Sequence, residues 1–241
     1  MKNTALIVEP RVLEKTVDIL NHFVDKLGDN WEYIFYCGIN TKQHWEKTGL
    51  YKIYELRELD VDNFSSPNFY SDFLKSREIW ESLSGEFVLT FQLDTWILGG
   101  NEYNIDYFIK LNKSYIGGNM NYNWVELLRD NIYFNHRNFN GGLSLRKRLD
   151  MLKIIETFPP KKTEEGLSSC IIETHPEDVY FTTGCYFLGF PLGDDETCSR
   201  FAIHSIFKDS FFGIHQPHDK IKDSLNQLFP ELKYKNPHLH L

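Results

Sequence analysis

The stretch that most constrains the fold is residues 87–98, which read FVLTFQLDTWIL. It opens with an unbroken run from Phe87 to Phe91 that is too short for a typical helix and rich in aromatic and β-branched residues. Such a run predicts a buried strand. Because both faces of this strand are apolar, we expect residues 87–91 to form an interior strand of a mainly parallel sheet.

Two polar side chains, Gln92 and Asp94, follow the apolar run. Positions two apart on a strand point to the same face, so both are expected to project together at or just beyond the strand's carboxyl end. In open α/β sheets, ligands bind at that edge. A carboxylate in so apolar a segment costs several kcal/mol unless it is paired or holds a metal. Two interpretations stay open: a ligand or metal site, or a carboxylate that caps a loop or pairs with a buried arginine.

The flanking sequence alternates between strand and helix patterns, which predicts an α/β fold. Its β–α–β opening predicts parallel strands with a right-handed crossover. Expected strands lie at residues 4–8, 31–37, 51–56, 115–118 and 211–218. Expected helices lie at residues 12–27, 41–45, 70–83 and 147–157, with another starting at 176–178 and a short one after 221. No repeat or linker divides the chain, so residues 1–241 are expected to form one domain.

Three segments are predicted to lie outside packed elements. Residues 119–140 are rich in Asn and aromatic residues, which suits a long surface loop that carries function. Residues 159–165 have two prolines followed by charges, which suits a mobile loop. His238 and His240 fall in a polar end of the chain, which we expect to be a disordered tail.

The formal net charge of −8 argues against a nucleic-acid backbone or an anionic membrane as the main partner. No apolar run approaches the roughly 18 residues of a membrane span, and the first residues, MKNTALIVEPR, lack the features of a signal peptide. We therefore expect a soluble, cytoplasmic protein. The four cysteines lie far apart without a CxxC pair, which favours free buried thiols over a disulfide framework or a zinc site.

The segment Asn140-Gly141-Gly142-Leu143-Ser144-Leu145-Arg146 is a second candidate for function. Its two glycines permit positive φ and close approach of another molecule. Asn140 and Ser144 offer hydrogen bonds to a hydroxyl-rich ligand, and Arg146 can bind an anion through two hydrogen bonds. The alternative is a glycine turn before a helix, with Arg146 on the solvated face.

Glu177 and Asp178 form a carboxylate pair before an aromatic run. One of them can act as a general base if burial or its neighbour raises its pKa. The alternative is favourable charge at a helix N-terminus. Further along, His215 follows a predicted strand, and Asp94 with His215 is a reasonable ligand pair for Mn²⁺, which accepts carboxylate, imidazole and water.

In this order, the stretches resemble a family of uncharacterised bacterial, viral and eukaryotic proteins with a GT-A type glycosyltransferase domain. The family pattern is a first strand ending near an Arg, a central FQxD strand, a YxGA strand, an NGGxSLR loop, an ED pair and a GxH. The matching residues are Glu9-Pro10-Arg11, Phe91 to Asp94, Tyr115 to Gly118, Asn140 to Arg146, Glu177-Asp178 and Gly213 to His215. The resemblance covers about residues 4–218.

The resemblance implies a single GT-A type, Rossmann-like nucleotide-sugar-binding domain. Its nucleotide-binding half is expected at about 4–100, its acceptor-binding half at about 101–218, and a tail at 219–241. The implied catalytic base is Asp178. The implied contacts are Arg11, Gln92 and Asp94 for the donor, Asn140, Gly141, Gly142, Ser144 and Arg146 for the acceptor, and Asp94 with His215 for a divalent metal, Mn²⁺ or Mg²⁺.

Two positions depart from the family pattern. Phe139 stands where the family usually has Gly before the Asn of the loop, and His204 stands where it often has Glu. Neither changes the expected fold, but both leave the acceptor open.

The activity implied is transfer of a sugar from a nucleotide-sugar donor, with UDP favoured because it is common among such enzymes, to a hydroxyl of a glycan, protein or small molecule. The reaction is expected to be inverting and metal-dependent. A sugar nucleotidyltransferase on the same fold is disfavoured because residues 4–16 contain no glycine. A catalytically inactive carbohydrate-binding protein is disfavoured because Asp94, Asp178 and His215 are all present.

Overall fold

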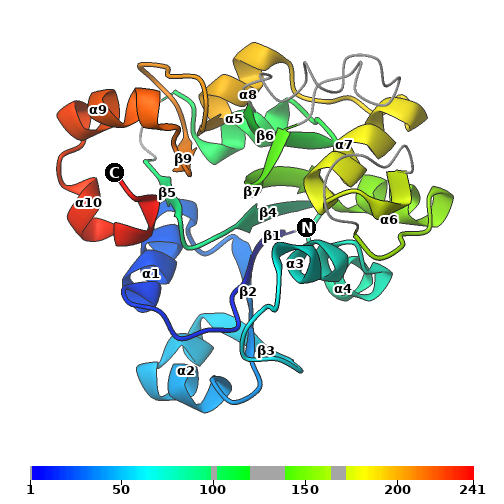
Figure 1. Ribbon diagram of the computed structural model, residues 1–241, viewed down its shortest axis with the longest axis horizontal. Helices are drawn as coiled ribbons and strands as arrows, with labels where there is room; N and C mark the ends of the chain where they lie inside the picture. The colour runs from blue at the N-terminus through cyan, green and yellow to red at the C-terminus, as the bar shows by residue number, and fades with distance from the viewer. Residues whose placement is uncertain (1, 99–101, 120–138, 164–171) are drawn as a thin grey trace.

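A six-stranded sheet forms the centre of the computed structural model, which describes residues 2–98, 102–119, 139–163 and 172–241 (Figure 1). In spatial order its strands are β3 (Tyr54–Leu59), β2 (Trp31–Gly38), β1 (Asn3–Val8), β4 (Phe87–Phe91), β7 (Phe139–Lys147) and β6 (Tyr115–Asn119). The first four run parallel to one another, and β7 runs antiparallel to both of its neighbours. The sheet is therefore mainly parallel, as predicted.

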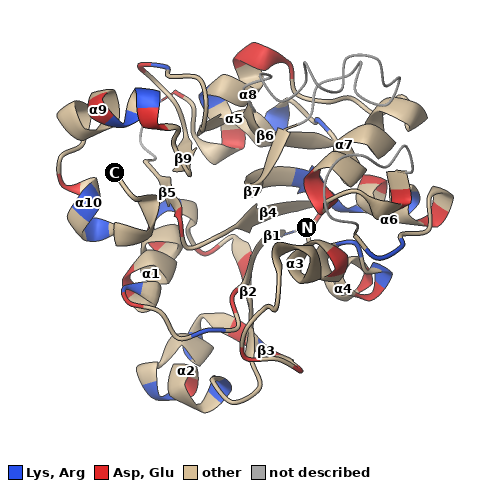
Figure 2. Ribbon diagram, viewed as in Figure 1, with Lys and Arg blue, Asp and Glu red and all other residues tan. Residues whose placement is uncertain are grey.

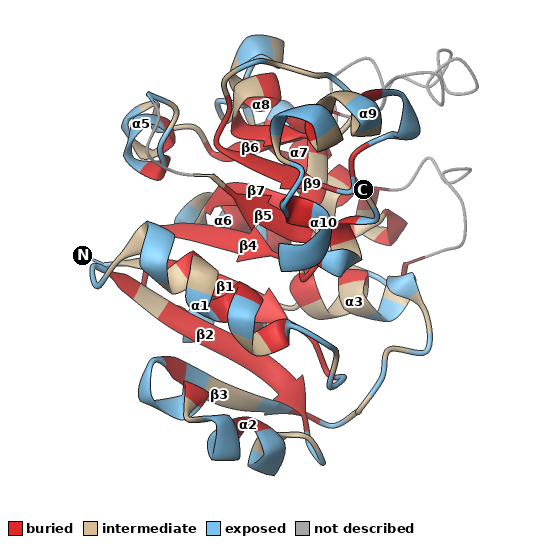
Figure 3. Ribbon diagram, turned by 90° about the vertical axis from the view of Figure 1, so that its left-hand side faces the viewer, coloured by how far each residue is buried: buried red, intermediate tan, exposed pale blue. Residues whose placement is uncertain are grey.

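Strand β4 lies between β1 and β7, and all five of its residues are buried. The prediction of an interior strand at residues 87–91 is confirmed. One face of the sheet carries α1 (Thr16–Leu27), and the opposite face carries a group of helices that pack on one another (Figures 1 and 3). This group consists of α3 (Pro67–Leu74), α4 (Arg77–Ser82), α6 (Arg148–Thr157) and α7 (Glu177–Leu188). Cover on both faces explains why the run is apolar throughout.

A smaller sheet lies beyond β4, in the order β5 (Thr95–Ile97), β9 (Gly213–His215) and β8 (Ala202–Ile203). The strand predicted at 211–218 is thus shorter than expected and belongs to this sheet. The other helices within the described residues are α2 (Lys42–Thr48), α5 (Ile105–Lys110), α8 (Asp195–Phe201), α9 (Asp219–Leu228) and α10 (Leu232–Lys235), with single 3₁₀ turns at Leu50–Lys52, Ile172–Thr174 and Pro237–Leu239. None of the helices in the described ranges is long and apolar enough to cross a membrane.

The prediction of a loop at Asn140–Arg146 is wrong, because these residues form most of β7. Leu143 and Leu145 are fully buried, and β7 pairs with β4 on one side and β6 on the other. Neither Gly141 nor Gly142 has the positive φ that was expected of a glycine turn.

The prediction of a disordered tail is also wrong. Residues 219–241 fold as α9, α10 and a 3₁₀ turn, and Asn236 and Leu239 from this part are buried. Of the two predicted loops, residues 120–138 and 164–165 lie outside the described residues.

The helix predicted at 70–83 is divided into α3 and α4 at Lys75, whose side chain is 1% exposed. Its ammonium group donates to the backbone oxygens of Lys161 and His175, both at 3.0 Å, and to Thr163 Oγ1 at 2.7 Å. Lys75 therefore joins α3 to the two stretches that precede α7.

We expect Lys75→Met to lower the free energy of unfolding by about 2–3 kcal/mol, because the buried oxygens lose their donor. Urea titration measures this change. The matched control is Lys153→Met on α6, where the side chain is 56% exposed and the ion pair with Glu156 is worth at most about 1 kcal/mol. Equal losses of unfolding free energy in the two variants would contradict the role of Lys75 in joining α3 to the stretches before α7.

Candidate active site

A cavity of about 820 Å³ lies at the edge of the main sheet where the parallel strands end. Its walls come from the residues after β1 and β4, from the first residues of β7 and from the first turn of α7. Because β7 runs the opposite way, its beginning meets the carboxyl ends of the others. The cavity brings together most of the predicted site: Arg11, Gln92, Asp94, Asn140, Gly141, Gly142, Asp178 and His215.

Asp94 and His215 lie side by side in the wall, with 3.5 Å between Asp94 Oδ1 and His215 Nε2. Gln216 donates from its side-chain amide to Asp94 Oδ2 at 2.6 Å. Gln92 Oε1 lies 3.3 Å from the same imidazole nitrogen. Burial disfavours the charge on Asp94, but His215 and Gln216 together hold its pKa below the usual value. Asp94 is therefore ionised at neutral pH.

The Asp94–His215 pair fits part of a divalent metal site. Apart from the His215 imidazole 3.5 Å away, the buried Asp94 Oδ1 finds no hydrogen-bond partner within the described residues, which is unfavourable for a carboxylate unless another group binds it. In that same part of the chain, no three His, Cys, Asp or Glu side chains are grouped to hold an ion. A cation bound here needs its other ligands from water and from an anionic substrate.

The two adjacent glycines of β7 make room for the protein's own side chains. A methyl group on Gly142 would overlap the imidazole of His215, and one on Gly141 would overlap the carboxylate of Glu177. The glycines were expected to let a ligand approach the backbone, but they are required here by packing within the chain. They allow β7 to lie directly against His215 and the start of α7.

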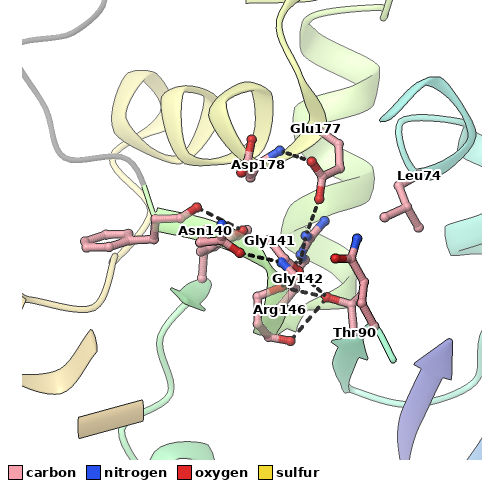
Figure 4. Close-up of polar contacts among 12 residues, drawn as sticks. Leu74, Thr90, Asn140, Gly141, Gly142, Arg146, Glu177 and Asp178 are labelled. Carbon is pink, nitrogen blue, oxygen red and sulfur yellow. Dashed lines mark hydrogen bonds and ion pairs between the residues drawn. The ribbon is translucent and has the colours of Figure 1, made fainter. Parts of the chain in front are cut away.

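Arg146 and Glu177 form a buried ion pair between β7 and α7 (Figure 4). Arg146 Nη2 donates to Glu177 Oε1 at 2.9 Å, and its Nε donates to Ser144 Oγ at 2.8 Å. Ser144 also shares a hydrogen bond of 2.6 Å with Thr90 of β4. Arg146 and Ser144 are both fully buried and do not line the cavity. The predicted acceptor contacts of these two residues do not fit this arrangement, nor does a solvated position for Arg146.

Asp178 lies next to Glu177 in the first turn of α7 and is partly exposed to the cavity. Burial and the negative charge of Glu177 raise the pKa of Asp178 to about 7. The backbone N–H of Val179 donates to Asp178 Oδ1 at 2.8 Å and acts in the opposite direction. A carboxylate that exchanges its proton near neutral pH has the property that a general base needs.

The cavity wall also contains side chains that the sequence does not assign to a site, among them Tyr70, His238 and His240. Tyr70 of α3 hydrogen-bonds with Gln92, and burial raises the pKa of its phenol. His238 and His240 come from the end that was expected to be disordered. The sequence carries no signal for these positions, because Tyr70 sits in an ordinary helical pattern and the two histidines sit in a polar segment.

Glu9 orients the side chain of Arg11. Glu9 accepts hydrogen bonds from the backbone N–H of Arg11 at 3.0 Å and from its Nε and Nη2 at 2.7 and 2.9 Å. About half of the Arg11 side chain stays exposed, so the guanidinium still faces the cavity.

Residues 53–217, more than half of the chain, match a family described as "Protein of unknown function (DUF5672)". The chain is a member of the DUF5672 family. No curated protein matches its sequence.

Two solved structures resemble this DUF5672 protein in fold. One is the apo form of the glycosyltransferase GlyE of Streptococcus pneumoniae, with a TM-score of 0.50 and 9% identity over 91% of this chain and 55% of GlyE. The other is residues 1–349 of TarS of S. aureus in complex with UDP, with a TM-score of 0.52 and 14% identity over 89% of this chain and 60% of that one. The DUF5672 chain thus spans little more than half the length of either. At these identities the likeness shows the fold, which is of the GT-A glycosyltransferase type.

We expect Gly142→Ala to lower the free energy of unfolding by about 1–3 kcal/mol, because the added methyl group forces the imidazole of His215 to move. The same substitution in a His215→Ala background should cost almost nothing. Urea titrations of the four proteins in this cycle measure the difference. An equal cost in both backgrounds would mean that the β7 backbone, and not the imidazole, requires glycine.

Proposed function

We propose that this DUF5672 protein is a glycosyltransferase that moves a sugar from a UDP-sugar donor to a hydroxyl acceptor, with inversion and with a divalent metal. The observation that carries the proposal is that one cavity holds both the Asp94–His215 pair and Asp178. The first suits the cation of a diphosphate, and the second suits the proton of a hydroxyl group. The GT-A type fold and its likeness to UDP-bound TarS support the proposal.

The charges around the cavity favour a metal-dependent donor. Its wall contains the carboxylates of Glu9, Asp94, Glu177 and Asp178. Glu9 is paired with Arg11 and Glu177 with the buried Arg146, so the remaining negative charge of the wall comes from Asp94 and Asp178. Figure 2 shows the acidic first turn of α7, and the chain as a whole carries a net charge of −8. A diphosphate entering this wall meets negative charge, so its binding needs a cation, and Asp94 with His215 offers the place for one.

The geometry suggests which residues of the site bind the donor, which bind the acceptor and which support the others. In our proposal Arg11 and Gln92 face the donor diphosphate, and Asn140 with the backbone of Gly141 and Gly142 faces the acceptor sugar. Ser144 and Arg146 take no direct part and act by holding Glu177, which in turn borders Asp178. This division revises the expected acceptor site to the residues that reach the cavity.

The proposed step is a displacement at the anomeric carbon of the donor sugar. The acceptor oxygen forms the new glycosidic bond while the bond to the diphosphate oxygen breaks. The hydroxyl proton passes to Asp178, and the electron pair leaves with the diphosphate. A divalent cation, when bound at Asp94 and His215, supplies positive charge opposite the leaving group.

We expect Asp94→Ala to weaken the binding of UDP in the presence of Mn²⁺ by at least about 100-fold, because the cation loses its charged ligand. Isothermal titration calorimetry measures this affinity. With EDTA in place of Mn²⁺, the wild-type affinity should fall to that of the variant. Asp106→Ala, which removes a first-turn carboxylate of α5, is the control and should bind normally. Unchanged affinity in Asp94→Ala would refute the metal role.

We expect Asp178→Asn to lower kcat by roughly 10²–10⁴-fold without changing the affinity for UDP and Mn²⁺, because the amide keeps the shape but cannot accept the proton. The assay is release of UDP from a UDP-sugar, with and without added glycan acceptors. The wild-type kcat/KM should rise with pH up to about 7 and then level off, since the base must be ionised.

The neighbouring variant Glu177→Gln separates catalysis from folding. It leaves the charge of Arg146 buried without its partner, so its main effect should be a loss of stability of about 3–5 kcal/mol. A folded but inactive Glu177→Gln beside an active Asp178→Asn would reverse the two roles. Release of pyrophosphate from UTP and a sugar phosphate would instead identify a nucleotidyltransferase, and binding without turnover an inactive sugar-binding protein.

A further inference from the structure

A buried side-chain amide connects residues 236–240 to the turn after β4 that contains Asp94. The side chain of Asn236 is fully buried. Its Nδ2 donates to Leu93 O and to Thr95 O, both at 2.8 Å. These two carbonyl groups flank Asp94 on either side. One side-chain amide thus holds the backbone at both neighbours of the proposed metal ligand, across 141 residues of sequence or more.

The same amide also shapes the segment that follows it. Asn236 Oδ1 accepts from the backbone N–H of His238 at 3.1 Å, which starts the 3₁₀ turn. Leu239 is 1% exposed and packs into the core, and the His238 imidazole lies 2.8 Å from Glu14 O. As a result His238 and His240, on either side of Leu239, both reach the cavity wall.

Residues 236–240 pack on β5 and pair with no strand of the main sheet. The segment lies beside the small sheet, away from the strands β1–β3 (Figure 3). Its polar groups contact the turn after β4, the backbone oxygen of Glu14 between β1 and α1, and the rim of the cavity. The two imidazoles also lie in a wall that is otherwise dominated by carboxylates, where added donors favour an anion.

We propose that residues 236–240 complete the donor site: Asn236 is a positioning residue for Asp94, and His240 contacts the diphosphate of the nucleotide. This inference rests on the proposed function, because it assigns the segment to the same nucleotide. A purely structural role for the segment predicts a loss of stability alone. The proposal predicts in addition a more mobile backbone around Asp94 and a loss of nucleotide affinity.

Three variants of the full chain test the proposal. Asn236→Ala removes the amide that holds the backbone on both sides of Asp94. His240→Ala removes an exposed imidazole from the cavity wall and leaves the core intact. The control, Tyr234→Ala, truncates a side chain that is 73% exposed in α10 and does not line the cavity. The probe is UDP with Mn²⁺, measured by calorimetry, and hydrogen–deuterium exchange reports on the backbone of residues 92–97.

In Asn236→Ala we expect faster exchange at residues 92–97 and an affinity for UDP with Mn²⁺ lower by about 10–100-fold, as is usual when a partner that orients a metal ligand is lost. In His240→Ala we expect unchanged exchange and an affinity lower by about tenfold, the effect of one hydrogen bond to a charged group. Tyr234→Ala should match the wild type in both measurements.

The outcomes separate this inference from the function on which it rests. Normal exchange at 92–97 in Asn236→Ala overturns the positioning role of Asn236, and normal affinity in His240→Ala overturns its contact with the diphosphate. Normal affinity in both variants overturns the link between the segment and the nucleotide. Each of these results leaves the proposed function intact if wild-type binding still depends on Mn²⁺ and Asp94. If the wild type binds none of UDP, ADP, GDP and CDP with Mn²⁺, the donor site itself is wrong and the inference falls with it.

Discussion

The ion pair between Arg146 and Glu177 is the interaction on which the arrangement of the cavity depends. Both side chains are buried between β7 and α7, where removal of either partner costs about 3–5 kcal/mol. The pair survives burial because Arg146 is also held by Ser144, which is tied to Thr90 of β4. The first turn of α7 is thereby fixed to the interior of the sheet. This attachment and a hydrogen bond between the Asp178 carboxylate and the backbone of Gly141 in β7 together place Asp178.

The same interaction explains why the strand β7 contains two adjacent glycines, Gly141 and Gly142. Glycine in a strand costs about 0.5–1 kcal/mol relative to alanine, so two in succession weaken β7. A Cβ at Gly141 would displace the carboxylate of Glu177 and disrupt the buried pair, which costs several times more. A Cβ at Gly142 would displace His215. Because these costs exceed the weakening of the strand, β7 keeps both glycines.

The parts of this fold that the sequence predicts are those whose cause is local. The apolar run at 87–91 and the spacing of Gln92 and Asp94 carry their meaning within a few residues. The pattern of β7 instead predicts a loop, because the reason for its glycines lies far away in the sequence. They make room for Glu177, which pairs with Arg146 across 31 residues, and for His215. The role of residues 236–240 is hidden for a similar reason: a single buried amide fixes a segment whose composition is otherwise polar.

The ion pair also contributes to the proton affinity of the proposed base. Burial is the largest cause of the raised pKa of Asp178, and the negative charge of Glu177, which is paired with Arg146, raises it further. If Glu177 were neutral, Asp178 would lose this repulsion and become a weaker base. The buried pair therefore contributes both to where Asp178 lies and to how strongly it holds a proton, which are the two properties that a general base requires.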